Sequence, residues 1–218
     1  MSFDQILKKD LYDLPELGTI NCHAGKLPFY RGRNILNWAL INGEKEFGIT
    51  VHYIDEGVDT GDIILQKSYP ISSQDDYRSL LTKAHGECPA VLCEAIQQIS
   101  SGSAQRFSQE EIHPFGTIFS QRKAGDETIN WSQSSKDIFN FIRAICPPGP
   151  AAQSMLNGSI VRILRAEMIE GAPSYKCIPG AILSKDNKGF FVKTGDSYIR
   201  ILEWESEEYL SAGKRFLQ

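Results

Sequence analysis

A run of five residues, Cys146 to Pro150, constrains the fold more than any other part of this 218-residue sequence. The run reads CPPGP, and three prolines with a glycine are incompatible with the interior of a helix or of a central strand. The apolar residues before it have helical spacing, so the run ends a helix predicted for residues 135–144. We therefore place a domain boundary here, between residues 1–145 and residues 146–218.

Before this boundary, predicted helices and strands alternate along the chain. Apolar spacing predicts helices at residues 3–14, 34–42 and 72–100, the last with a break near residues 86–89. Short β-prone runs predict strands at residues 18–22, 48–54 and 63–69. Residues 101–128 are rich in Ser, Gly and Gln and read as a long connection. This alternation is typical of the α/β class.

After the boundary the pattern changes to short strands separated by turn residues. Alternating apolar residues predict strands at 160–166, 180–183, 190–193 and 198–204, with turns such as Asn157-Gly158 between them. Such a pattern is typical of a small antiparallel sheet or partial barrel. The predicted fold is therefore an α/β domain followed by a small, β-rich (OB-like) carboxyl-terminal domain.

Composition and charge limit the partners and the location. With 41% hydrophobic and 23% charged residues, the chain reads as an ordinary globular protein, and no stretch approaches the ~18 apolar residues of a membrane span. The first ten residues do not resemble a signal peptide. Five scattered cysteines without a CxxC spacing favour reduced thiols over a disulfide framework or a metal site. We expect a cytoplasmic protein that binds neither membrane nor metal.

The charge balance also bears on nucleic-acid binding. The net charge is −4, and residues 146–218 contain nine Lys or Arg against eight Asp or Glu. Proteins that bind nucleic acid through phosphates usually present a basic face. A local basic patch is compatible with this balance, but the balance itself argues against a tRNA-binding module.

A polar cluster follows the first predicted strand. Asn21 and His23 are two residues apart, so in an extended backbone their side chains share one face. An amide donor beside an imidazole can polarise a carbonyl group and move a proton. A single histidine after a strand is also found as a hydrogen-bonded structural residue, so both interpretations stand on the residues alone. His52, on a predicted strand face with Thr50, is either structural or a support of this cluster.

Two loops flank the cluster. The first is basic: Lys26, Tyr30, Arg31 and Arg33 lie among glycines, which suits a phosphate or diphosphate, and a solvated loop with arginine–carboxylate pairs is the alternative. The second runs from Asp55 to Asp62 and is acidic. It does not fit a calcium loop, because the sixth and twelfth positions are Thr60 and Gln66.

Several motifs in these loops together resemble the formyltransferases that use 10-formyltetrahydrofolate. They are Asn21-x-His23, Leu27-Pro28, Arg31-Gly32 and Asp55-Glu56-Gly57-x-Asp59-x-Gly61. The resemblance implies a one-carbon transferase in which Asn21, His23 and Asp59 are catalytic, while Asp55, Glu56, Gly57 and Val58 line the folate pocket. It also implies a Rossmann-like catalytic domain, of which an amino-terminal half of roughly eighty residues would precede these motifs.

The acceptor is a separate question, and the resemblance is greatest to enzymes of nucleotide-linked amino sugars. The run HAGKLPFYRGRN and the near-neutral carboxyl-terminal part favour a dTDP- or UDP-4-amino-4,6-dideoxyhexose, as in lipopolysaccharide O-antigen synthesis. Lys26, Tyr30, Arg31 and Arg33 would then bind this substrate. Methionyl-tRNA formyltransferase is the first alternative, and formyltetrahydrofolate hydrolase is the next.

A further alternative is an inactive fragment that serves only as a binding or dimerisation module. If the preceding half is absent, a sheet edge that it would cover is left exposed. Exposed edges associate readily, so we expect a homodimer.

Overall fold

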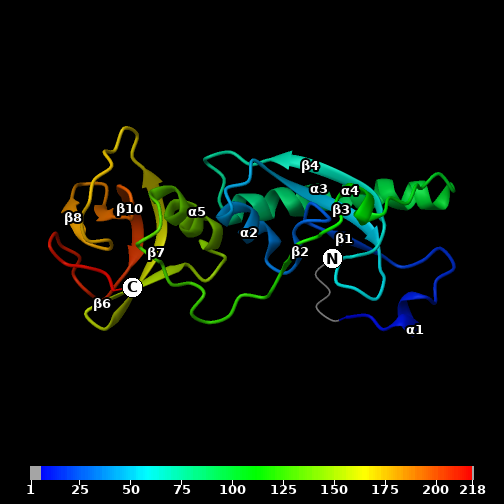
Figure 1. Ribbon diagram of the computed structural model, residues 1–218, viewed down its shortest axis with the longest axis horizontal. Coiled ribbons are helices and arrows are strands. Elements are labelled where there is room, and N and C mark those ends of the chain that lie inside the picture. Colours follow the sequence, from blue (N-terminus) through cyan, green and yellow to red (C-terminus); the bar gives the residue numbers. More distant parts are fainter. Residues whose placement is uncertain (1–5, 218) are drawn as a thin grey trace. The chain divides into compact units, whose positions relative to one another are not determined.

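The structure is a computed structural model, and it describes residues 6–217 (Figure 1). These residues form two compact units. The first contains residues 6–39, 44–73 and 79–122, and the second contains residues 40–43, 74–78 and 123–217. In the described part of the chain, no helix is long and apolar enough to cross a membrane.

A three-stranded antiparallel sheet organises the first unit. Its strands are β1 (Ile20–His23), β3 (Glu46–Tyr53) and β4 (Ile63–Pro70), in the order β1-β3-β4. Both faces of β3 are buried, although its sequence alternates, because the polar residues on one face are hydrogen-bonded. The Thr50 hydroxyl, for example, donates to the Gly25 carbonyl at 2.7 Å. The register places Asn21 opposite His52 and His23 opposite Thr50.

The helices α2 (Ile35–Ile41) and α3 (Tyr77–Ser100) lie where the apolar spacing predicts them. Helix α3 runs through Pro89 without interruption, so the predicted break is wrong. Cys88, Val91 and Ala95 are buried along one face of α3 on both sides of the proline. Their packing holds the helix together where one backbone hydrogen bond is absent.

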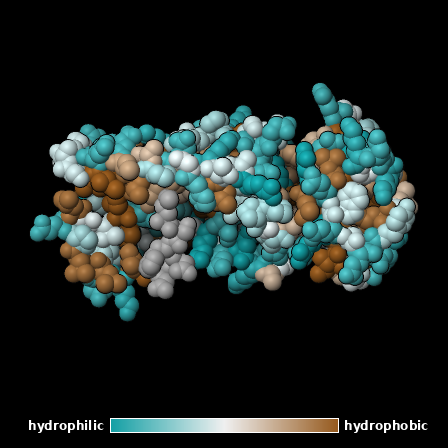
Figure 2. Space-filling model, turned by 180° about the vertical axis from the view of Figure 1, so that it is seen from behind, coloured by the Kyte–Doolittle hydropathy of each residue, from teal (hydrophilic) through white to brown (hydrophobic). Residues whose placement is uncertain are grey.

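The predicted helix at residues 3–14 is reduced to α1 (Lys9–Tyr12) in the described residues, and positions 3–5 lie outside them. Its apolar residues Ile6 and Leu11 are exposed, so they provide no burial to stabilise a longer helix. Figure 2 shows such apolar (brown) side chains reaching the surface among hydrophilic (teal) ones.

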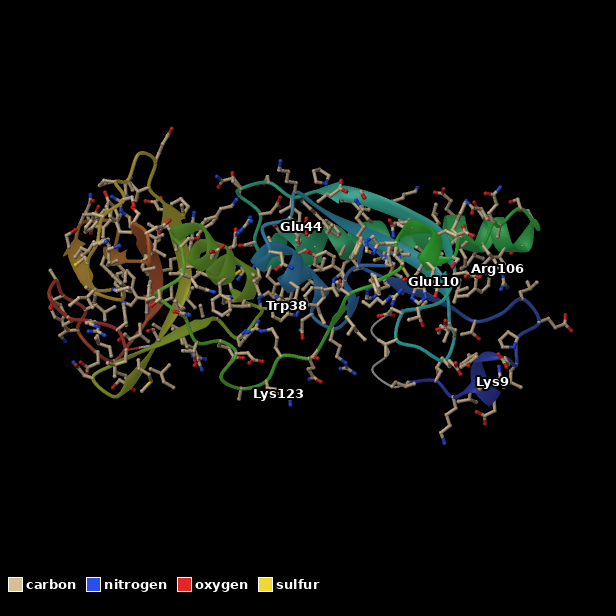
Figure 3. The ribbon with its side chains drawn as sticks, viewed as in Figure 1. Lys9, Trp38, Glu44, Arg106, Glu110 and Lys123 are labelled. Carbon is tan, nitrogen blue, oxygen red and sulfur yellow. The ribbon has the colours of Figure 1, made fainter. Side chains whose placement is uncertain are left out.

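The segment after α3 has more structure than the predicted connection. It contains α4 (Gln109–Ile112) and β5 (Ile118–Phe119), and β5 pairs in parallel with β2 (Arg31–Gly32). Arg106, labelled with Glu110 in Figure 3, lies 3.8 Å above the Tyr53 ring, measured to the ring centroid. Elements of two to four residues are too short for periodicity to predict. This segment brings residues 106–119 against the strands of the first unit.

The second unit contains α5 (Ser135–Ile145) and a five-stranded antiparallel sheet. The strands are β6 (Ala152–Leu156), β7 (Ser159–Met168), β8 (Ile182–Lys185), β9 (Phe190–Lys193) and β10 (Tyr198–Glu205), in the order β6-β7-β10-β9-β8. The N-cap of α5 is Ser134, whose hydroxyl accepts the Asp137 backbone N–H. The fold class predicted from the sequence is confirmed: an α/β part followed by a β-rich part.

Trp131 lies at the centre of the second unit's core. Its ring stacks on Phe216 with centroids 5.3 Å apart, and its indole N–H donates to the Ser154 hydroxyl at 2.9 Å. The large aromatic side chain is therefore buried with its one polar group satisfied.

Candidate active site

The structure brings Asn21, His23 and Asp59 together. Strand β1 places Asn21 and His23 on one face, as their spacing predicts, and the loop after β3 returns Asp59 to that face. The Asn21 side-chain amide donates to Asp59 Oδ1 at 3.4 Å, and Asp59 Oδ2 lies 3.6 Å from His23 Nδ1. An amide and an imidazole from strand β1 thus meet a carboxylate from a loop far away in sequence.

The Asp59 carboxylate is held in place by the backbone. Its φ is +54°, in the left-handed region, and its Oδ2 accepts the Gly32 backbone N–H at 2.9 Å. Burial raises the pKa of Asp59, but the neighbouring His52 and His23 and the Gly32 N–H outweigh burial and leave the pKa at about 2. Asp59 is therefore a carboxylate at neutral pH.

His23 is positioned as a neutral base. Its Nε2 lies 2.7 Å from the Tyr30 carbonyl oxygen, which can only accept, so Nε2 carries the proton and Nδ1 keeps its lone pair toward Asp59. The residue is 8% exposed. Burial lowers the pKa of His23, with the Asp59 charge opposing that effect in part. A neutral imidazole whose free nitrogen faces a carboxylate can take up a proton and be stabilised as a cation.

His52 belongs to the same cluster. Its Nδ1 donates to the Tyr53 carbonyl at 2.7 Å, and its Nε2 accepts from the Asn21 amide at 3.4 Å and lies 3.5 Å from Asp59 Oδ1. The sequence left His52 between a structural and a supporting role, and the structure places it directly against Asn21 and Asp59. The signal for this was the shared strand face of Thr50 and His52.

The acidic loop is ordered by its own first residue. Asp55 Oδ1 accepts the Gly57 backbone N–H at 3.1 Å and the Thr60 hydroxyl at 2.5 Å. Glu56, Gly57 and Val58 are exposed, and Val58 presents an apolar side chain to solvent. In the described residues, no group of three or more His, Cys, Asp or Glu side chains is arranged to hold a metal ion.

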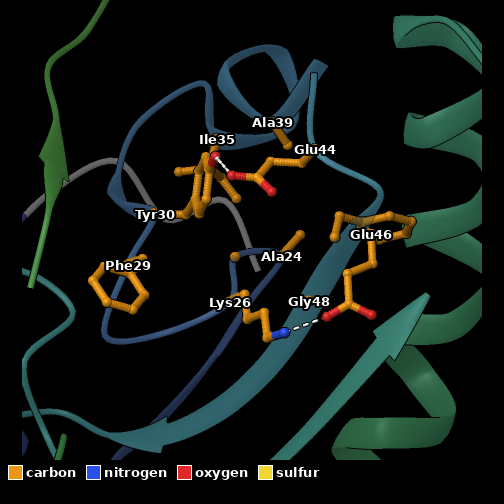
Figure 4. A pocket seen from close by; sticks show the side chains of 11 residues that line it. Ala24, Lys26, Phe29, Tyr30, Ile35, Ala39, Glu44, Glu46 and Gly48 are labelled. Carbon is orange, nitrogen blue, oxygen red and sulfur yellow. Dashed lines mark hydrogen bonds and ion pairs between the residues drawn. The ribbon is translucent and has the colours of Figure 1, made fainter. Parts of the chain in front are cut away.

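A pocket of about 260 Å³ is lined by residues of the basic loop, of α2 and of the start of β3 (Figure 4). Its wall includes Gly25, which touches the His23 ring so closely that a Cβ at this position would lie 2.4 Å from Nε2. The apolar part of the lining is Phe29, Ile35, Ala39 and Phe47. Two polar pairs lie at its rim: Lys26 binds Glu46, and the Tyr30 hydroxyl donates to Glu44 at 2.6 Å.

The two arginines of the basic loop lie elsewhere. The Arg31 guanidinium donates twice to Gln109 Oε1, from Nε at 3.0 Å and from Nη2 at 2.7 Å. The Arg33 backbone N–H donates to the Phe119 carbonyl at 2.9 Å. Of the four residues predicted to bind the acceptor, Lys26 and Tyr30 therefore line the pocket, whereas Arg31 is engaged by Gln109. Gln109 could not be predicted from the sequence, because a lone glutamine in a polar segment carries no local signal.

The lowered pKa of His23 predicts a pH dependence of stability. The folded protein binds a proton at His23 less readily than the unfolded chain, whose histidine has a pKa near 6.5. The contribution of a neutral His23 to the free energy of unfolding is therefore complete above pH 6.5 and is lost as the pH falls below it. We expect the free energy of unfolding of the wild type, relative to His23→Gln, to decrease between about pH 7.5 and pH 5 in urea titrations.

His85→Gln, the same change at an exposed position on α3, is the matched control. A difference between wild type and His23→Gln that does not change with pH, or that grows on acidification, contradicts this interpretation of His23.

Comparison with known proteins identifies the family. Residues 1–96 match the family described as Formyl transferase, and residues 121–215 match Formyl transferase, C-terminal domain. The chain belongs to the formyl transferase family, so the predicted class, a formyltransferase enzyme of one-carbon transfer, is confirmed.

Curated relatives match nearly the whole chain. A methionyl-tRNA formyltransferase of Thermodesulfovibrio yellowstonii is 36% identical over all of this chain and 68% of its own length. One of Pelotomaculum thermopropionicum is 34% identical over 98% of this chain and 67% of its own. The chain thus spans about two thirds of the length of these relatives.

Among solved structures, the sugar 3N-formyl transferase WlaRD, determined in the presence of dTDP and 5-N-formyl-THF, is 28% identical. It superposes with a TM-score of 0.70 over 95% of this chain and 71% of its own.

The prediction of a nucleotide-sugar acceptor, and with it O-antigen synthesis, is wrong. Eight curated relatives at 32–36% identity are named methionyl-tRNA formyltransferase. The prediction rested in part on the near-neutral charge of residues 146–218. A net charge averages over the whole surface, so it does not report how basic side chains are distributed.

Proposed function

We propose that this chain carries the catalytic site and the carboxyl-terminal domain of a methionyl-tRNA formyltransferase. The reaction moves a formyl group from 10-formyltetrahydrofolate to the amino group of methionyl-tRNA. The observation that carries the proposal is the agreement of eight curated relatives on this name, together with the cluster of Asn21, His23 and Asp59 that the structure places in the amino-terminal unit.

Formyl transfer requires that an amine lose a proton while a tetrahedral oxyanion is stabilised. In our proposal His23 takes the amine proton, because its Nδ1 holds a lone pair in a buried site. The Tyr30 carbonyl orients the imidazole, and Asp59, 3.6 Å from Nδ1, stabilises the cation that forms when Nδ1 takes the proton. The same proton can then pass to the nitrogen of the leaving tetrahydrofolate.

Asn21 supplies the hydrogen bond to the oxyanion. Its amide makes two long contacts of 3.4 Å, to Asp59 Oδ1 and to His52 Nε2, so it is oriented without being held by a short bond. An amide N–H aimed at a developing oxyanion lowers a barrier by about 3 kcal/mol in typical cases. His52 keeps Asn21 in this orientation, because its Nδ1–H is fixed on the Tyr53 carbonyl and leaves Nε2 to accept.

The folate donor is assigned to the loop of Asp55, Glu56, Gly57 and Val58. The loop is exposed and internally ordered by Asp55, and Val58 offers an apolar surface. An ordered loop with an exposed apolar side chain fits a planar heterocycle that stacks on it. The presence of 5-N-formyl-THF in the WlaRD structure supports the same class of donor.

The pocket shown in Figure 4 is assigned to the acceptor's methionyl side chain. Part of its lining is apolar, and Gly25 in its wall contacts the His23 ring at Nε2, the nitrogen other than the one that would take the amine proton. An unbranched thioether side chain suits such a pocket, because methionine adapts to irregular apolar surfaces. Glu44, which accepts from the Tyr30 hydroxyl, and the Lys26–Glu46 ion pair supply the polar part of the lining. A cytoplasmic location and a homodimer stay as predictions beside this proposal.

Binding of tRNA tests the acceptor assignment. Affinity of the chain for initiator methionyl-tRNA is expected to fall roughly 10²-fold between about 50 mM and about 200 mM salt, the response of a few phosphate contacts. Filter binding measures it, and calorimetry with 5-formyltetrahydrofolate measures the donor site in the same sample. Asp59→Ala should weaken folate binding and leave the salt dependence of tRNA binding unchanged. A folded chain that binds the folate but shows no salt-dependent affinity for tRNA contradicts the acceptor.

A further inference from the structure

Gln109 is a buried residue that the roles proposed above do not use. It is the first residue of α4, in the segment that follows α3, and it is only 2% exposed. A buried amide is costly unless each of its polar atoms finds a partner. All of the hydrogen-bonding groups of the Gln109 side chain are satisfied, and every partner lies in one of the two loops of the candidate active site.

The donor half of the Gln109 amide holds the acidic loop. Its Nε2 donates to the Asp59 carbonyl and to the Gly61 carbonyl, each at 2.8 Å. These carbonyls lie on either side of Thr60, so one amide fixes the backbone around it. Asp59 has a φ of +54°, which residues other than glycine seldom adopt. Such a conformation persists only where surrounding contacts impose it.

The acceptor half holds the basic loop. Gln109 Oε1 accepts from Arg31 Nε and Nη2, and the residue after Arg31, Gly32, donates its backbone N–H to Asp59 Oδ2 at 2.9 Å. The segment that carries Gln109 also binds the basic loop further along the chain, where β5 pairs with β2. Gln109 therefore contacts the main chain of Asp59 itself and the side chain of Arg31, the residue next to the Gly32 whose N–H binds the Asp59 carboxylate.

We propose that Gln109 is a positioning residue of the reaction proposed above: it sets the Asp59 carboxylate against His23 by joining the acidic loop to the basic loop. These hydrogen bonds require a side-chain amide of the length of glutamine. A glutamate in its place accepts from Arg31 but donates to neither carbonyl, and an asparagine is one methylene too short to reach both loops. Gln109 acts through Asp59 and touches no reacting atom.

The role has a signature that a purely structural role does not have. The Asp59 charge raises the pKa of His23 against the effect of burial, so an Asp59 that is no longer held close leaves burial unopposed. We expect Gln109→Met, which keeps the length of the side chain and removes its hydrogen bonds, to lower the pKa of His23. Titration of the imidazole by NMR with labelled histidine measures it, and Gln97→Met, the same change at an exposed position of α3, is the matched control.

A double variant separates a positioning role of Gln109 from a purely structural one. In Asp59→Asn the pKa of His23 is already lowered, and adding Gln109→Met should lower it no further, because Gln109 acts through Asp59. If Gln109→Met fails to fold, Gln109→Glu in the two backgrounds gives the same comparison, since the charge it adds is present in both. A folded Gln109→Met with an unchanged His23 pKa overturns the proposal, as does an equal fall in pKa with and without Asp59.

The catalytic readout depends on the proposed function, whereas the titration does not. In a chain that transfers formyl groups, Gln109→Met should lower kcat on the order of 10²-fold with little change in KM, the effect of a misplaced catalytic group. A chain without transferase activity in which the His23 titration still shifts refutes the proposed function and leaves the positioning role standing. Normal kcat in Gln109→Met refutes the positioning role.

Discussion

Replacement of Asp59 by asparagine is expected to slow formyl transfer on the order of 10⁴-fold while the protein stays folded. The two side chains have the same shape, so packing is preserved. The charge that stabilises the His23 imidazolium is lost, and the amide group of the new side chain has one acceptor where the carboxylate has two. The Asp59 carboxylate accepts from the Asn21 amide and the Gly32 N–H, and it lies within 3.6 Å of a ring nitrogen of both His23 and His52. One amide oxygen cannot replace these contacts.

Single-turnover transfer from 10-formyltetrahydrofolate measures this effect, because it separates chemistry from product release. Asp62→Asn is the matched control: it makes the same chemical change at the end of the same loop. The side chain of Asp59 is 14% exposed and its pKa is held at about 2, so the wild-type carboxylate is ionised throughout the working range. A rate for Asp59→Asn within a few-fold of the wild type contradicts the role assigned to this carboxylate.

Gly32→Ala is expected to cost about 3 kcal/mol of unfolding free energy or more, the sum of backbone strain and overpacking. The φ of Gly32 is +93°, and a Cβ there would lie 2.3 Å from the Phe119 carbonyl oxygen, which is backbone and has little room to move. Any relaxation opens the pairing of β2 with β5 and moves the N–H that binds Asp59. Activity should therefore fall together with stability.

Gly102→Ala provides the control for this effect. Gly102 also has a positive φ, +71°, but a Cβ there would meet nothing within 4 Å. This variant carries the backbone strain without the clash and should lose only about 1 kcal/mol, with unchanged activity. Urea denaturation measures both variants. Equal losses at the two positions would mean that the contact with Phe119 does not constrain the site.

Period-two spacing was enough to predict how Asn21 and His23 share a face, because a strand allows only one arrangement of such a pair. The position of Asp59 beside them came from the family motif, since no local pattern links residues so distant in sequence. His52 could be placed on the correct strand face, but its contact with Asn21 depends on the register of β1 with β3. Sequence patterns constrain each strand and leave the pairing between strands open.

Gln109 marks the limit of sequence reasoning at this site. Its role arises from four hydrogen bonds to residues 48 to 78 positions away, and nothing in the surrounding SQEEI distinguishes it from a solvated glutamine. The helix predicted at residues 3–14 is short in the described residues for the opposite reason: its local pattern was helical, but its apolar residues Ile6 and Leu11 are exposed. The nucleotide-sugar prediction was wrong in part because a net charge was taken as a description of a surface.

The most direct test of the central claim is a single-turnover assay of formyl transfer from 10-formyltetrahydrofolate to methionyl-tRNA, with the wild type and His23→Gln compared side by side. We predict transfer by the wild type to the methionyl amine and a rate for His23→Gln lower by about 10²-fold to 10⁴-fold, the usual contribution of a general base. Equal rates for the two proteins would contradict the assigned site. Absence of transfer by a folded wild type that binds both substrates would contradict the proposed function itself.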